Sequence, residues 1–218
     1  VVRSLRDTPD FFVGREALLE AMTPPRRWTG DAVIDMQKCV LDRLRGEIEA
    51  LRRDALEVIE TSRGNMSSQA RVHAAVLALI EAADFDALVH VVADDLPLLL
   101  DVDVATLGFE RPGKGMRLPP AAPLRDLKKG VAEALFGPDR HVMLLGEVRD
   151  DGSLFGAAAG LVRSAALACI RPGPTCPAGV LSLGSRTNTF QPGQGTELVV
   201  FLARVVEACI LRCLGPAD

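Results

Sequence analysis

The clearest hydrophobic periodicity of the chain lies in the segment 30–65. Apolar positions recur there alternately three and four residues apart, which is the spacing of the a and d positions of a coiled-coil heptad. This seam consists of Ile34, Gln37, Leu41, Leu44, Ile48, Leu51, Ala55 and Val58. Because the stripe is narrow and the other faces are charged, we predict a linker helix that pairs with a second copy. A helix packed on its own domain is the alternative. The residues that we expect at the dimer interface are Leu41, Leu44, Ile48, Leu51 and Val58.

The segment 1–29, which precedes this linker, carries strong helix-stop signals. Two short helices are predicted within residues 1–22, and Pro24-Pro25 ends the second because proline cannot continue a helix. An exposed hinge that carries Trp28 then leads to Asp31, a predicted N-cap of the linker helix. We therefore treat 1–29 as a separate appendage.

The segment 66–218 has the pattern of one mixed domain. Residues 66–83 are apolar on more than one helical face, which is typical of a helix buried between layers. Asp84 is the predicted N-cap of a second helix, and Pro97 is predicted to end it.

Beyond Asp101 the hydrophobic period shortens to two, which predicts strands. The expected elements are a strand at 102–107, a loop at 112–123, a helix from Leu124 to Leu135, a strand at 141–145, a strand pair at 163–170 and 179–185, and a terminal helix ending near Cys213. This order predicts an α+β fold in which helices gather on one side of an antiparallel sheet.

Several blocks of sequence resemble a known family. They are Thr8-Pro9-Asp10-Phe11-Phe12, Leu154-Phe155-Gly156, Arg163-Ser164-Ala165-Ala166-Leu167, Gly179-Val180-Leu181-Ser182-Leu183-Gly184-Ser185 and Phe190-Gln191-Pro192-Gly193. In order and spacing they resemble the DUF484 family of bacterial proteins. The resemblance runs nearly end to end and implies a GAF-like domain behind a helical stalk, with no established biochemical activity.

Composition narrows the possible functions. Aromatic residues are 4% of the 218 residues and the net charge is −4, so neither stacking on single-stranded nucleic acid nor attraction to phosphate backbones is expected. No apolar run is long enough to cross a bilayer, and the N-terminus lacks a signal-peptide pattern. Five cysteines without dense spacing fit reduced thiols. We expect a soluble, cytoplasmic protein without membrane or direct nucleic-acid partners.

In a GAF-like fold a small ligand would lie between the sheet and the loops that cover it. The long connections at 111–123 and 146–162 are the predicted covers. The candidate ligand-binding residues are Arg163, which could clamp an anion, Ser185, Leu107 and Phe155. The alternative for Arg163 is a sheet-edge position or an ion pair with Asp150 or Asp151.

No catalytic, cofactor or metal site is predicted, because the histidines are isolated and no nucleophile motif is present. Cys169 and Cys176 flank a turn and could meet across it, although burial as small hydrophobes is the simpler interpretation. Three functions therefore stay open: a homodimeric regulatory module that binds an unknown small molecule, a scaffold whose pocket is filled by its own side chains, and a thiol-dependent enzyme.

Overall fold

The computed structural model describes residues 21, 36–113 and 118–214. The chain falls into two compact parts, residues 1–62 and 63–218. The predicted short helices before residue 21, the hinge with Trp28, the Asp31 cap and Ile34 of the seam lie outside the described residues.

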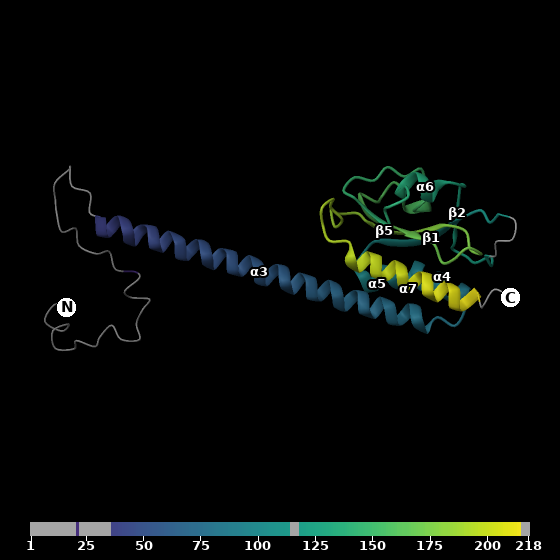
Figure 1. Ribbon diagram of the computed structural model, residues 1–218, viewed down its shortest axis with the longest axis horizontal. Helices are drawn as coiled ribbons and strands as arrows, with labels where there is room; N and C mark the ends of the chain where they lie inside the picture. Colours follow the sequence, from purple (N-terminus) through teal and green to yellow (C-terminus); the bar gives the residue numbers. More distant parts are fainter. Residues whose placement is uncertain (1–20, 22–35, 114–117, 215–218) are drawn as a thin grey trace. The chain divides into compact units, whose positions relative to one another are not determined.

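The helix α3 extends from Met36 to Glu81 as 46 continuous residues (Figure 1). The linker helix and the helix predicted at 66–83 are thus one element. This stretch contains no proline, and its two glycines, Gly46 and Gly64, each weaken the helix by only about 1 kcal/mol.

The next helical region contains a correction. Asp84 is the N-cap of α4 (Phe85–His90), as predicted, and its Oδ1 accepts a hydrogen bond from the Ala87 amide at 2.8 Å. The prediction that Pro97 ends the helix is wrong, because the chain continues through a π-helical turn (Val91–Asp95) into α5 (Leu96–Leu100). Pro97 lies in the first turn of α5, where a missing N–H is tolerated.

The sheet has five strands in the order β2-β1-β5-β4-β3. The strands are β1 (Val104–Glu110), β2 (Arg125–Leu127), β3 (Val142–Leu145), β4 (Ser164–Ile170) and β5 (Gly179–Ser185). The predicted pair is confirmed as the antiparallel neighbours β4 and β5, which are buried along their whole length. All pairings are antiparallel except that of β1 with β2.

The helix predicted to begin at Leu124 begins later. Residues Arg125–Leu127 form the short strand β2, and only Val131–Phe136 is helical, as α6. Gly130 has φ +86° and therefore breaks the backbone between the two elements at little steric cost. Three residues of strand are too few to reveal a period of two.

Two layers cover the sheet, and the predicted α+β class is confirmed. On one face, here called the helix face, β-strand side chains pack against α3, α4, α5 and α7 (Glu197–Leu214). On the other, the α6 face, they pack against α6 and the connection 146–162 (Figure 1). Strand β4 shows the division by its alternation: Ala166, Ala168 and Ile170 belong to the helix-face core and Ala165, Leu167 and Cys169 to the α6-face core. No described helix is both long and apolar enough to cross a membrane.

Candidate functional site

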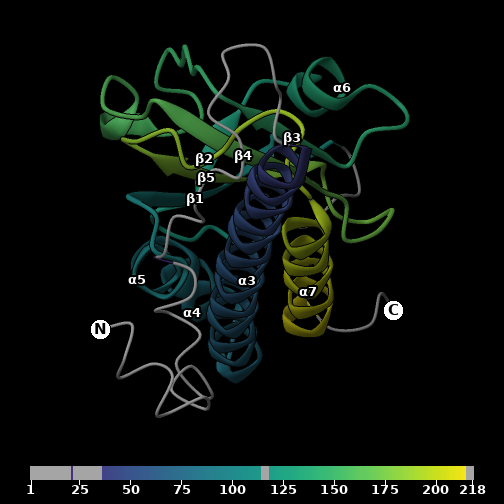
Figure 2. The same cartoon turned by 90° about the vertical axis from the view of Figure 1, so that its left-hand side faces the viewer.

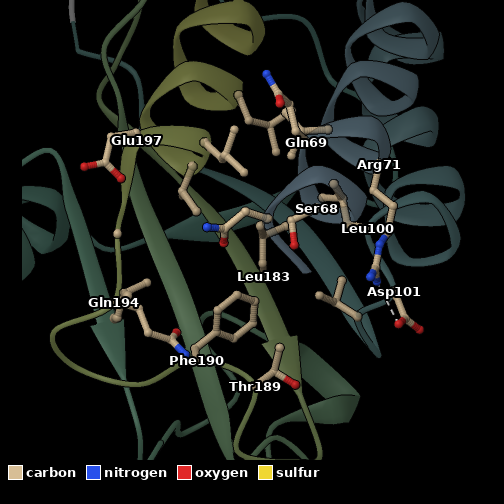
Figure 3. A pocket seen from close by; sticks show the side chains of 18 residues that line it. Ser68, Gln69, Arg71, Leu100, Asp101, Leu183, Thr189, Phe190, Gln194 and Glu197 are labelled. Carbon is tan, nitrogen blue, oxygen red and sulfur yellow. Dashed lines mark hydrogen bonds and ion pairs between the residues drawn. The ribbon is translucent and has the colours of Figure 1, made fainter. Parts of the chain in front are cut away.

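A cavity of about 850 Å³ opens on the helix face. Its walls come from α3, from the end of α5 and from the segment that leads into α7 (Figure 3). The apolar lining residues are Val72, Leu100, Val102, Leu144, Leu183, Phe190, Leu198, Val199 and Leu202. An apolar floor with a limited set of polar groups is typical of a small-molecule site.

The strand register brings two apolar residues of the cavity to either side of a small one. Ala166 of β4 is paired with Leu144 of β3 on one side and with Leu183 of β5 on the other. All three side chains point to the helix face, so a methyl group lies between two larger side chains. The flanking leucines line the cavity, whereas Ala166 is fully buried between them and does not line it.

The rim of the cavity is polar. Ser68 and Gln69 of α3 lie along one side, and Thr189 and Gln194 lie on the opposite side (Figure 3). Asn65 of α3 also lines the cavity. Amides and hydroxyls both donate and accept hydrogen bonds, so this rim can bind an uncharged polar group in either sense.

The charged residues that line the cavity carry a net negative charge. The Arg71 guanidinium donates to Asp101 Oδ2 at 2.8 Å and to Ser67 Oγ at 3.2 Å, so a ligand anion would have to compete for it. Glu197, in the first turn of α7, adds a carboxylate. The site is therefore better suited to a neutral or cationic ligand than to an anion.

A hydroxyl network supports the wall formed by Thr189 and Phe190. Thr189 Oγ1 donates to Ser185 Oγ at 3.0 Å, and Ser185 Oγ also bonds Asp103 Oδ2 at 3.2 Å. The Phe190 amide donates to Ser164 Oγ at 3.2 Å. Ser185, a predicted ligand residue, thus lies behind the cavity wall and does not line the cavity.

The structure does not bring the four predicted ligand residues together. Leu107 is buried in the helix-face core, whereas Phe155 is buried in the α6-face core. Arg163 is exposed, and its amide donates to the Ser185 carbonyl at 2.8 Å. Asp150, the suggested partner of Arg163, accepts hydrogen bonds from the amides of Leu154 and Phe155.

The connection 146–162, a predicted pocket cover, is packed closely on the sheet. Thr106 Oγ1 donates to the Leu154 carbonyl at 2.8 Å and fastens it. A Cβ at Gly184 would lie 2.9 Å from both Phe155 Cε1 and Val162 Cγ2, so these side chains fill the space above that glycine. The described cavity is on the other face, and its lining includes no residue of 146–162 and no described residue of 111–123, that is, of 111–113 and 118–123.

Sequence reasoning missed the cavity residues Asn65, Gln69, Phe190 and Gln194. A signal existed in α3, where Asn65, Ser68 and Gln69 interrupt the stripe just before the buried Val72. Polar side chains at these positions indicate that this part of α3 does not cover the apolar core completely.

The thiols of the described domain are free and mostly buried. Cys169 belongs to the α6-face core and Cys176 to the helix-face core, so the two do not meet across their turn. Burial raises the pKa of the Cys176 thiol to about 11 and also raises the pKa values of Cys169 and Cys209. These thiols are therefore protonated and weakly nucleophilic at neutral pH.

The predicted seam is apolar and exposed along α3. Leu41, Leu44 and Ile48 are 43%, 47% and 48% exposed, and Leu51 and Val58 are each 67% exposed. An ion pair between Arg43 and Glu47 at 2.9 Å lies on the same helix. Five large apolar side chains at heptad spacing, each exposed by two fifths or more, form a surface that association would bury.

The family model described as "Protein of unknown function, DUF484" matches residues 1–214. No curated protein matches the sequence.

Proposed function

The chain belongs to the DUF484 family, to which no function is assigned, and from its structure we propose a homodimeric, non-enzymatic regulatory module. In this proposal a GAF-like domain binds a small molecule in the helix-face cavity, and α3 carries the response to the rest of the chain.

One observation carries the proposal: α3 contributes both a wall of the cavity and the exposed seam. Asn65, Ser68, Gln69, Arg71 and Val72 line the cavity, and the seam residues precede them on the same helix. A ligand in the cavity would contact the helix through which two copies associate. Binding that favours one arrangement of α3 would then shift the population of that arrangement.

The ligand that this site favours is an uncharged molecule with an apolar body and a hydrogen-bonding group. The floor offers apolar contact, and the amides and hydroxyls of the rim offer orientation. Its size is limited by the cavity volume of about 850 Å³.

Light scattering on the full chain tests the dimer. We expect twice the chain mass at tens of micromolar protein, and a monomer for the double variant Leu44→Glu, Leu51→Glu, because two carboxylates in each seam oppose burial. A monomeric mass for the unmodified protein would refute the homodimer.

Nile red, an uncharged apolar dye, tests the cavity. Its fluorescence should rise with the full chain and stay low with Ser68→Trp, which fills the cavity from the rim without altering the core. Arg63→Trp is the matched control, because Arg63 is an exposed α3 residue that does not line the cavity. Equal dye binding by both variants would contradict the proposed site.

A scaffold is the second candidate, and the closely packed α6 face favours it. Phe155 and Val162 occupy the space above Gly184 where the GAF-like interpretation expected a ligand. A dimer that binds no dye and no small molecule would fit this role. A thiol enzyme has less support, since burial raises the pKa of Cys169, Cys176 and Cys209.

A further inference from the structure

One side of α3 changes from apolar to polar where it borders the helix-face cavity. Val72 and Ala75 lie on this side and are buried. Counted back in steps of three and four residues, which keep to one side of a helix, the same row contains Asn65, Ser68 and Gln69. All three of these polar residues line the cavity. The side of the helix that covers the core is therefore polar only beside the cavity.

The polar side chains of this row have unused hydrogen-bonding capacity. In the part of the chain that the structure describes, none of the three forms a hydrogen bond or an ion pair. They are also exposed, so a ligand can reach them. Across the cavity (Figure 3), Thr189 Oγ1 already donates to Ser185 Oγ at 3.0 Å, and Gln194 Oε1 already accepts from the Gln191 amide at 3.0 Å. The hydrogen-bonding group of a ligand is therefore expected on the α3 side.

Two of the three residues carry the same functional group. Asn65 and Gln69 are one helical turn apart, a spacing that places Cβ atoms roughly 5–6 Å from each other. Each carboxamide offers N–H donors next to a carbonyl acceptor. A ligand group pairs with both functions of a carboxamide when it also presents a donor and an acceptor side by side. Amides, lactams and ureas have this arrangement.

Ligand groups without such a pair of functions should bind less well. An acceptor-only group, such as a ketone, would separate the carboxamide N–H and C=O groups from solvent and leave part of them unpaired. An anion would meet the carboxylate of Glu197 at the lining, while Arg71 is occupied by Asp101 at 2.8 Å. The chemistry of the lining thus favours an uncharged donor–acceptor group.

We propose that the cavity selects ligands that carry an uncharged amide-type group, and that Asn65 and Gln69 are the specificity-determining residues. The inference rests on the proposed function and adds to it the class of the ligand and its orientation. The apolar body of the ligand lies on the floor of the cavity, and its amide-type group contacts α3, the helix to which the proposed function assigns the response.

Three naphthalene compounds of similar size test this specificity by titration calorimetry with the full chain. Naphthaleneacetamide carries the proposed amide group. Naphthylacetone has a methyl group in place of the amide nitrogen and can only accept hydrogen bonds, and naphthaleneacetate is an anion at neutral pH. We expect the dissociation constant of the amide to be about tenfold lower than that of the ketone or the acetate.

The double variant Asn65→Leu, Gln69→Met separates specificity from binding itself. Leucine and methionine are close in size to the replaced side chains and favour the helix, but they have no amide group. This variant should bind the ketone as the unmodified chain does and lose the preference for the amide. Arg63→Met is the matched control, because Arg63 is an exposed α3 residue that does not line the cavity. The control should keep the preference, and circular dichroism checks that both variants fold.

Several results would overturn the proposal. These are equal affinities of the unmodified chain for amide and ketone, tighter binding of the acetate, and an unchanged preference in the double variant. If Nile red binds and Ser68→Trp excludes it while the amide has no advantage, the cavity of the proposed function stands and its amide specificity fails. If neither Nile red nor any of the naphthalene compounds binds, both fail.

Discussion

The two faces of the sheet are covered in different ways, and the cavity described above lies on the helix face. On the α6 face a connection lies flat on the strands and inserts Phe155, which is 3% exposed, over a glycine. On the helix face the helices α3, α4, α5 and α7 cover the strands, and a cavity stays open beside Leu144, Leu183 and Phe190. A flexible connection can follow the surface of a sheet and fill it with side chains. Helices are rigid, so the spacing at which they pack can leave a gap between them and the strands.

The largest expected effect tests how tightly the α6 face is filled. Phe155→Ala should lower the free energy of unfolding by about 3–5 kcal/mol, because it leaves a void among buried neighbours that the fastened connection cannot close. Urea denaturation of the full chain measures the change. A loss of less than about 1 kcal/mol would mean that the connection collapses freely and that the two faces do not differ as described.

A pH series tests whether the helix face is dry away from its cavity. Burial raises the pKa of Cys176 from 9.0 to about 11, so the folded state binds this proton more tightly than the unfolded state. The resulting stabilisation is complete below the unfolded pKa and is lost as the pH rises toward the folded pKa. It amounts to roughly 2–3 kcal/mol for this shift.

The measurement is the difference between the unmodified chain and Cys176→Ala across pH 8 to 11. The unmodified chain should lose more stability over this range, because only it carries the buried thiol of Cys176, while Cys169 and Cys209 are common to both proteins. Parallel pH curves would show that water already reaches Cys176, and the helix face would then be open well beyond the cavity.

Substitution of one glycine on each face of the sheet tests the difference in packing at single positions, with a smaller expected effect. A Cβ at Gly184 would lie 2.8 Å from Val104 Cγ1 and 2.9 Å from Phe155 Cε1, so Gly184→Ala should destabilise the fold by about 2 kcal/mol through overpacking. Gly146→Ala is the matched control, since its Cβ would meet Pro192 at 3.4 Å, an ordinary contact distance. Thermal unfolding of the two variants compares them, and similar melting temperatures would contradict the filled α6 face.

The sequence predicted the elements that have a long apolar run or a recognisable capping residue. It missed an element that forms only because it pairs with a strand distant in sequence. Strands β4 and β5 and helix α7 are long apolar runs between turn residues, and the side chain of Asp84 caps the helix that it precedes. Strand β2 has three residues and exists because it pairs with β1, which local spacing cannot show.

The site was harder to predict than the fold because its geometry depends on register. The strand pairing brings the cavity residues Leu144 and Leu183 to either side of Ala166, although the two leucines are far apart in sequence. Phe155 and Leu107 are apolar residues of the kind that line pockets, yet each is fully used in one of the two cores. The heptad spacing of the seam, by contrast, is local and visible in the sequence, and its role in pairing stays a prediction.

The smallest expected effect concerns the counterpart of Phe155 on the helix face. Phe190 is half-buried, lines the cavity and is held by its amide bond to Ser164 Oγ. Phe190→Ala should therefore lower the free energy of unfolding by only about 1 kcal/mol, because the side chain is only partly buried and lines the cavity. The Phe190→Ala variant also has a wider cavity without an aromatic side chain in its wall. The affinity of this variant for Nile red should therefore fall, even though its fold is nearly unchanged.

Phe190→Leu, which keeps an apolar side chain, should retain most of the dye binding. A loss of stability as large as that of Phe155→Ala would show that Phe190 is a core residue and that the cavity closes in solution, which would remove the difference between the two faces.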